Sequence, residues 1–148
     1  MGMTIINIVT EIDAETEGDF IKNFKDRFPL FNVKIFTSGF HGVIGQVDVD
    51  EIDRKCETDE VFYEKLEEVY CEKELENFSR IYPNNIFGFI EMDCHGGFCV
   101  YGGIVVKNGE IITMIGEKEN GHIDILKQIN ENYTGSFFEP FTRKFLET

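Results

Sequence analysis

The chain has 148 residues, and its 28 Asp and Glu against 14 Lys and Arg give a formal net charge of -14 at pH 7. This charge opposes binding to nucleic acid and to anionic membranes, so a basic protein is the more natural partner. The 15 Phe and a hydrophobic fraction of 42% exclude a disordered acidic chain, because such chains are poor in aromatic residues. A single domain over residues 1–148 is expected.

The sequence also indicates where the protein resides. Its N-terminus lacks the basic and apolar segments of a secretory signal, and no run approaches the ~20 apolar residues of a membrane span. We therefore predict a cytoplasmic protein that binds no membrane and needs no cofactor. In that compartment its four cysteines are expected to be reduced thiols rather than a disulfide framework. They are Cys56, Cys71, Cys94 and Cys99.

The first third of the chain predicts the order β-α-β-β. Residues 4–10 form an apolar, β-branched run that is typical of a buried strand. Residues 15–28 follow as a helix with its phenylalanines on one face and a capping box at residues 16–19. Residues 32–37 and 43–49 alternate apolar and polar side chains on either side of a Ser-Gly turn, which predicts a hairpin.

A long helical region is predicted next, beginning near Thr58 or Asp59, either of which can cap it. Apolar residues of its first and second halves fall on opposite sides of the helix, at the ~100° per residue of helical geometry. We therefore expect the helix to kink or restart between Cys71 and Leu75.

The clearest strand signal lies in the C-terminal half. Residues 86–94, 98–106 and 110–115 read as three strands, and the Asn-Gly turn at 108–109 is a strong hairpin signal. Residues 122–130 predict a short helix. We predict an α+β fold in a single domain, built on one mostly antiparallel sheet with a C-terminal three-stranded meander and two to four helices packed on it.

Two further details of this half are predicted. The pair Gly102-Gly103 within a strand indicates a bulge or a close backbone approach. The aromatic tail, residues 137–146, is expected to pack back on the sheet.

Clustered carboxylates are the main functional signal. Glutamate recurs every fourth residue at Glu60, Glu64, Glu68 and Glu72, which stacks like charges at a cost of about 0.2–0.5 kcal/mol of helix stability for each pair. We interpret this stripe, which is secure only as far as Glu68, as a docking face for a basic protein; a solvated helix face is the simpler alternative. The candidate partner-binding residues are Glu60, Glu64, Glu67 and Glu68, followed by Asp48, Asp50 and Asp53.

An alternative site centres on Cys94, His95 and Cys99. Two thiols and an imidazole at a hairpin tip suit zinc, although the second ligand pair of most zinc sites is missing. A tight turn would instead bring the cysteines close enough for a disulfide under oxidation. Half-buried strand cysteines are the simplest interpretation, so no metal and no catalytic residue is expected. His41 and His122 lie beside glycines and are expected to be exposed or bonded to the backbone.

The segment from Glu91 to Gly109 reads as an acidic strand, a Gly-Gly turn, a second strand and the turn Lys107-Asn108-Gly109. In this order it resembles small bacterial cytoplasmic immunity proteins of toxin–immunity systems. Those proteins have an aromatic residue before the Gly-Gly pair, where this chain has His95. The resemblance implies inhibition by stoichiometric binding, in which an acidic surface covers the basic active site of a toxin, often a nuclease.

Three functions therefore stand beside one another, and each makes a different prediction. An acidic binding protein predicts a salt-sensitive complex and no metal. A thiol- or zinc-dependent enzyme at Cys94, His95 and Cys99 predicts near-stoichiometric zinc or one unusually reactive cysteine. A generic interaction or regulatory module predicts a partner that is neither basic nor toxic.

Overall fold

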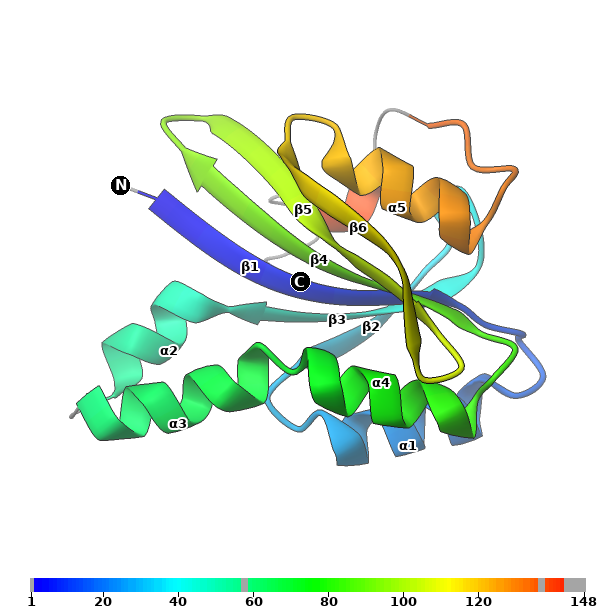
Figure 1. Ribbon diagram of the computed structural model, residues 1–148, viewed down its shortest axis with the longest axis horizontal. Coiled ribbons are helices and arrows are strands. Elements are labelled where there is room, and N and C mark those ends of the chain that lie inside the picture. Colours follow the sequence, from blue (N-terminus) through cyan, green and yellow to red (C-terminus); the bar gives the residue numbers. More distant parts are fainter. Residues whose placement is uncertain (1, 57–58, 136–137, 143–148) are drawn as a thin grey trace.

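Six strands form one sheet in the computed structural model, which describes residues 2–56, 59–135 and 138–142 (Figure 1). The strand order is β2-β3-β1-β4-β5-β6, and each pair of neighbours is antiparallel. The predicted α+β class, the β2–β3 hairpin and the β4-β5-β6 meander are confirmed. The strands are β1 (Gly2–Glu11), β2 (Asn32–Phe36), β3 (Gly42–Asp48), β4 (Ile86–His95), β5 (Phe98–Lys107) and β6 (Glu110–Lys118).

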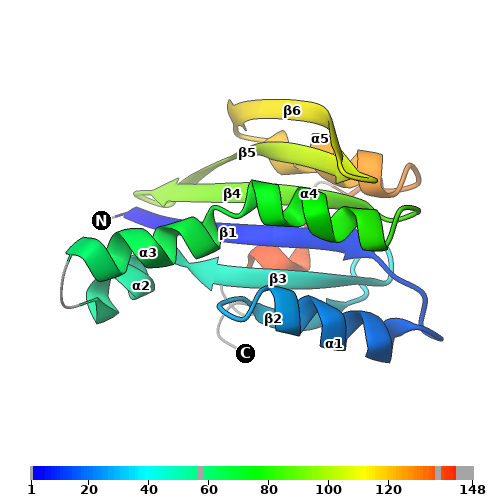
Figure 2. The same cartoon turned by 60° about the horizontal axis from the view of Figure 1, so that its bottom comes forward.

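Helices cover both faces of the sheet (Figures 1 and 2). One face packs against α1 and α4 and is called the α4 face below; the other packs against α5 and η1 and is called the α5 face. None of the described helices is long and apolar enough to cross a membrane. The helices are α1 (Glu17–Arg27), α2 (Val49–Lys55), α3 (Asp59–Val69), α4 (Glu72–Ile81), α5 (Gly121–Ile129) and the 3-10 helix η1 (Glu139–Phe141).

Phenylalanine rings fill the core of the α4 face. The four-residue spacing of Phe20 and Phe24 places both on the inner side of α1, and buried Phe28 follows directly after the helix. Their ring centroids lie 6.0, 5.8 and 5.4 Å from that of Phe78 in α4, in edge-to-face arrangements. Such pairs add about 0.5–1.5 kcal/mol each beyond their buried area, so Phe rings can build this core without Trp.

The core of the α5 face combines α5 with the described part of the aromatic tail. Phe138 is buried, and its ring centroid lies 5.1 Å from that of Phe36 in β2. The predicted packing of the tail on the sheet is confirmed for Phe138 and Phe141. Residues 137 and 143–146 of the same prediction lie outside the described residues.

The expectation for His122 is wrong. Its side chain is only 6% exposed, its ring centroid lies 3.9 Å from that of Tyr101, and its Nδ1 finds no hydrogen-bond partner among the residues that the structure describes. Burial lowers the pKa of His122 to about 4, against the opposing charge of Asp124. The imidazole is therefore neutral near pH 7. His41 is half-buried and lies 2.7 Å from Glu17.

Helix boundaries show what the sequence pattern missed. The predicted break is confirmed, because α3 ends at Val69 and α4 begins at Glu72. The additional helix α2 was not predicted, because seven residues are too few to show a periodic apolar face. The capping box proposed for α1 is wrong, since the side chain of its N-cap residue, Thr16, makes no capping hydrogen bond.

Candidate functional site

Three of the four predicted docking glutamates of α3 are exposed. Glu64, Glu67 and Glu68 line a groove of about 500 Å³ between α3 and the end of α1. Glu68 lies 3.8 Å from Lys65, so its charge is partly balanced. Glu60 lies within α3, but its side chain is outside the described residues. Because Glu72 begins a separate helix, the stripe does not continue past Glu68.

The second predicted acidic group has structural partners. The Asp48 carboxylate caps α2, accepting hydrogen bonds from the backbone N–H groups of Asp50 and Glu51 at 3.0 and 3.2 Å. Asp50 accepts a hydrogen bond from the backbone N–H of Thr4 at 3.0 Å. Asp53 is exposed on α2. Asp48 and Asp50 therefore hold α2 in place, which is a structural role separate from the predicted docking.

The alternative site at the β4–β5 turn contains a disulfide. Cys94 and Cys99 are directly opposite each other in the ladder, with Cα atoms 4.1 Å apart, and their sulfur atoms are bonded. The expectation of reduced thiols is therefore wrong for this pair, while Cys56 and Cys71 are free. A disulfide leaves no thiolate to ligate zinc or to attack a substrate.

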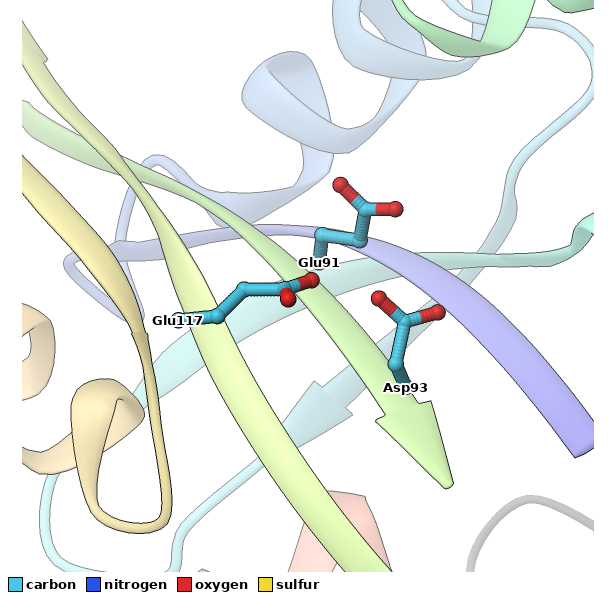
Figure 3. Close-up of side chains that lie close together, drawn as sticks. All are labelled: Glu91, Asp93 and Glu117. Carbon is cyan, nitrogen blue, oxygen red and sulfur yellow. The ribbon is translucent and has the colours of Figure 1, made fainter. Parts of the chain in front are cut away.

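A carboxylate cluster that the sequence analysis did not single out lies on the α4 face. Glu91 and Asp93 of β4 and Glu117 of β6 place carboxylate oxygens within 4.8 Å of one another. Glu91 and Asp93 are half-buried and Glu117 is exposed. Figure 3 shows the Glu117 side chain reaching across β5 toward the two carboxylates of β4.

Strand alternation and one glycine build this cluster. Glu91 and Asp93 are two residues apart in β4, so both project from the same face. Gly102 of β5 lies opposite Glu91, where a Cβ atom would meet the backbone N of Glu117 at 2.9 Å. A shift of register between Tyr101 and Gly103 accompanies this close approach, which confirms the predicted bulge.

Neighbouring hydroxyl groups hold two of the carboxylates in position. Thr4 in β1 donates a hydrogen bond from Oγ1 to Asp93 Oδ1 at 2.6 Å. Tyr70, between α3 and α4, donates from Oη to Glu91 Oε1 at 3.3 Å. The orientations of Glu91 and Asp93 are thus set by protein contacts, whereas Glu117 approaches from the edge of the sheet.

The electrostatics of the cluster favour protonation. Burial raises the pKa of Glu91, and the charges of Asp93 and Glu72 raise it further, against a lowering effect of the Tyr70 hydrogen bond. A hydrogen bond with Asp93 is the largest cause that raises the pKa of Glu117, followed by burial and by the charges of Asp93 and Glu91. Burial and the charge of Glu91 raise the pKa of Tyr70 to about 12. The site therefore concentrates negative charge that repels itself.

No basic side chain compensates this charge within the described part of the chain. None of the ion pairs formed by described residues involves Glu91, Asp93 or Glu117, and the adjacent Lys118 pairs with Asp124. An added cation would relieve the repulsion. Three carboxylates suit a hard divalent metal ion, which prefers oxygen ligands, and they equally suit the ammonium or guanidinium group of a partner protein.

Comparison with known proteins gives no relative from which to assign a function. No family model matches the chain, and the searches of curated proteins and of solved structures find no match. The chemistry of the described residues is therefore the basis for the proposal that follows.

Part of the cluster had a signal in the sequence. The motif Glu91-Met92-Asp93 places two acids at alternating positions of an otherwise apolar strand, which indicates a shared face. The third member had no such signal, because Glu117 lies more than twenty residues further along the chain and joins the others only through the bulged pairing of β5 and β6.

Proposed function

We propose that this chain is a non-enzymatic acidic binding protein whose partner is a basic protein. The observation that carries the proposal is the carboxylate cluster, whose three carboxyl groups lie within 4.8 Å of one another without a basic partner among the described residues. A Lys or Arg side chain of the partner would supply the missing charge and form charge-assisted hydrogen bonds.

Long-range electrostatics favour a protein over a single metal ion as the occupant of this surface. A net charge of -14 creates a field that extends beyond one site and raises the rate of encounter with a basic partner. Glu117 is exposed on the outermost strand of the sheet, where a large molecule has access to it. A metal ion would neutralise only the cluster, and the negative field of the other acidic residues would then have no role in binding.

The more specific form of the proposal is neutralisation of a toxin. The resemblance of Glu91–Gly109 to bacterial immunity proteins supports a basic, nuclease-like toxin domain as the partner, bound so that its active site is covered. Glu91 itself belongs to that segment and to the carboxylate cluster. We further propose a cytoplasmic location for the protein.

The glutamates of α3 are proposed as a second, weaker contact surface. Glu64 and Glu67 are exposed beside the groove, and their charges extend the acidic field. Exposed charges are screened by salt and contribute little to a bound complex, so their main effect is expected on the rate of association.

Affinity capture with two matched variants tests the proposal. Wild-type protein, the variant E91Q/D93N/E117Q and the variant E64Q/E67Q/E68Q are immobilised and exposed to host lysate at low ionic strength. Bound proteins are eluted between about 0.1 and 1 M salt, where the screening length falls from roughly 10 to 3 Å, and are identified by mass spectrometry. Each variant removes three carboxylates, so the two are matched in net charge.

The expected result is one basic protein that elutes late from the wild type, nearly as late from the α3 variant, and early from the cluster variant. Elution at the same salt concentration from the wild type and both immobilised variants would contradict the role of the cluster. A captured protein that is neutral or acidic would contradict the proposed class of partner.

A further inference from the structure

The outer edge of β6 is the longest uncovered strand edge of the sheet. β6 spans nine residues and pairs only with β5, so the backbone groups on its other side meet no further strand of the described chain (Figure 2). The opposite edge strand, β2, spans five residues. An unpaired edge is a template for another strand, and native proteins usually shorten or cover it.

Apolar side chains accompany this open edge. Ile111, Ile112 and Met114 of β6 are 42%, 49% and 76% exposed, whereas β2 has one comparable residue, Ile35, at 41%. Exposed apolar residues are ordinary when scattered, but three of them within four positions of an unpaired strand indicate an interaction surface.

Two bulges align these residues with the carboxylate cluster. Ladder pairing places Ile111 opposite Val106 and Met114 opposite Ile104, so both lie on the α4 face. Each register shift adds one residue to β6, and Glu117 consequently reaches the same face three residues after Met114. One strip of β6 therefore presents two apolar residues and then a carboxylate that has no basic partner in the described part of the chain.

We propose that the edge of β6 accepts an extended strand of the basic partner, which continues the sheet as a seventh strand. This inference rests on the proposed function and names its docking surface. Backbone hydrogen bonds would supply affinity, as in other complexes formed by strand addition, and side chains would supply specificity. The partner strand is expected to place apolar residues beside Ile111 and Met114 and a Lys or Arg beside Glu117.

Charge argues against a second copy of this chain as the occupant. Each copy carries a net charge of -14, so two copies repel each other as they approach. A basic strand reverses the sign of this effect.

Hydrogen exchange with a model strand tests the inference. The probe is a synthetic peptide as long as β6, with Val at the positions that face Ile111 and Met114, and with Lys at the position that faces Glu117 and at the positions of the opposite face. The control peptide has the same composition with D-Val at each Val, which prevents a regular strand. Amide exchange in β6 is followed by NMR in wild type, in Ile112→Lys and in Ile35→Lys. The two variants each add one positive charge to an edge strand, at residues of similar exposure.

The expected result is slower exchange of outward-facing β6 amides, by about tenfold, with the L-peptide alone. Ile112→Lys should weaken peptide binding at least about fivefold more than Ile35→Lys, because a charge on an edge strand blocks pairing.

Salt-sensitive binding of both peptides without protection of β6 would overturn the inference and leave the proposed function standing. Absence of binding would also overturn it, while the capture experiment decides the proposed function separately. Protection that grows with protein concentration in the absence of peptide would identify a second copy as the occupant and overturn it too.

Discussion

At the scale of single residues, Glu91 is the side chain whose environment is most informative. It is half-buried, accepts a hydrogen bond from Tyr70 and faces the charges of Asp93 and Glu72. Its raised pKa means that the folded protein holds this proton more tightly than the unfolded chain does. The corresponding contribution to stability is present below the ordinary pKa of Glu and is lost as pH rises through the raised value.

Replacing Glu91 with Gln is therefore expected to stabilise the free protein at pH 7, because the variant keeps the hydrogen-bond acceptor and removes the repelling charge. The gain should disappear at about pH 3, more than one unit below the ordinary pKa of Glu, where Glu91 is protonated in both states. Urea denaturation of wild type and variant at the two pH values measures this difference. Glu67→Gln, at an exposed position of α3, is the control. A variant less stable than wild type at pH 7 would show that the charge of Glu91 is compensated.

At the scale of elements, short segments are positioned by contacts that periodicity does not reveal. α2 has seven residues, and the Asp48 side chain caps its N-terminus. Lys55 and Glu51 form an ion pair at 2.7 Å, and Asp50 accepts a hydrogen bond from the backbone of β1. Asp48 and Asp50 were predicted as docking residues because acidic residues cluster in this part of the sequence. Clustered acids at the start of a helix also stabilise its N-terminus, and this second explanation applies to Asp48.

The structural role of Asp48 predicts a measurable loss. Asp48→Ala removes the cap of α2 and should lower the free energy of unfolding by about 0.5–2 kcal/mol. Asp53→Ala, in the same helix but without a capping contact, should change it by no more than about 0.5 kcal/mol. Chemical denaturation of both variants provides the measurement. Equal effects of the two substitutions would show that the cap contributes nothing to stability.

At the scale of the whole molecule, the predictable features were those with local signals. Apolar, β-branched runs and alternating apolar residues located all six strands, and the Asn-Gly turn fixed the β5–β6 hairpin. The break between α3 and α4 followed from the change of apolar side. The short helix α2, the cross-strand disulfide and the buried His122 depend on tertiary contacts. So does the carboxylate cluster, whose third member reaches the others only because the bulge at Gly102 and Gly103 shifts β6 by one residue.

The net charge, the carboxylate cluster and the open edge of β6 can act together in binding one partner. A chain with a net charge of -14 places a carboxylate cluster, which no described basic side chain compensates, beside an open, partly apolar strand edge. The charge would guide a basic partner to the molecule, the cluster would bind its cations, and the edge of β6 would fix its orientation. The cluster is the central part of this account, because it joins the long-range field to a defined contact.

Zero-length cross-linking of the captured complex tests that claim most directly. A carbodiimide couples a carboxylate to a lysine amine only when the two are in contact, and peptide mass spectrometry identifies the joined residues. The account predicts cross-links from Glu91, Asp93 or Glu117 to lysines of the basic partner, and their loss when the complex is formed in high salt. Cross-links confined to Glu64, Glu67 and Glu68 of α3, with none from the cluster, would contradict it.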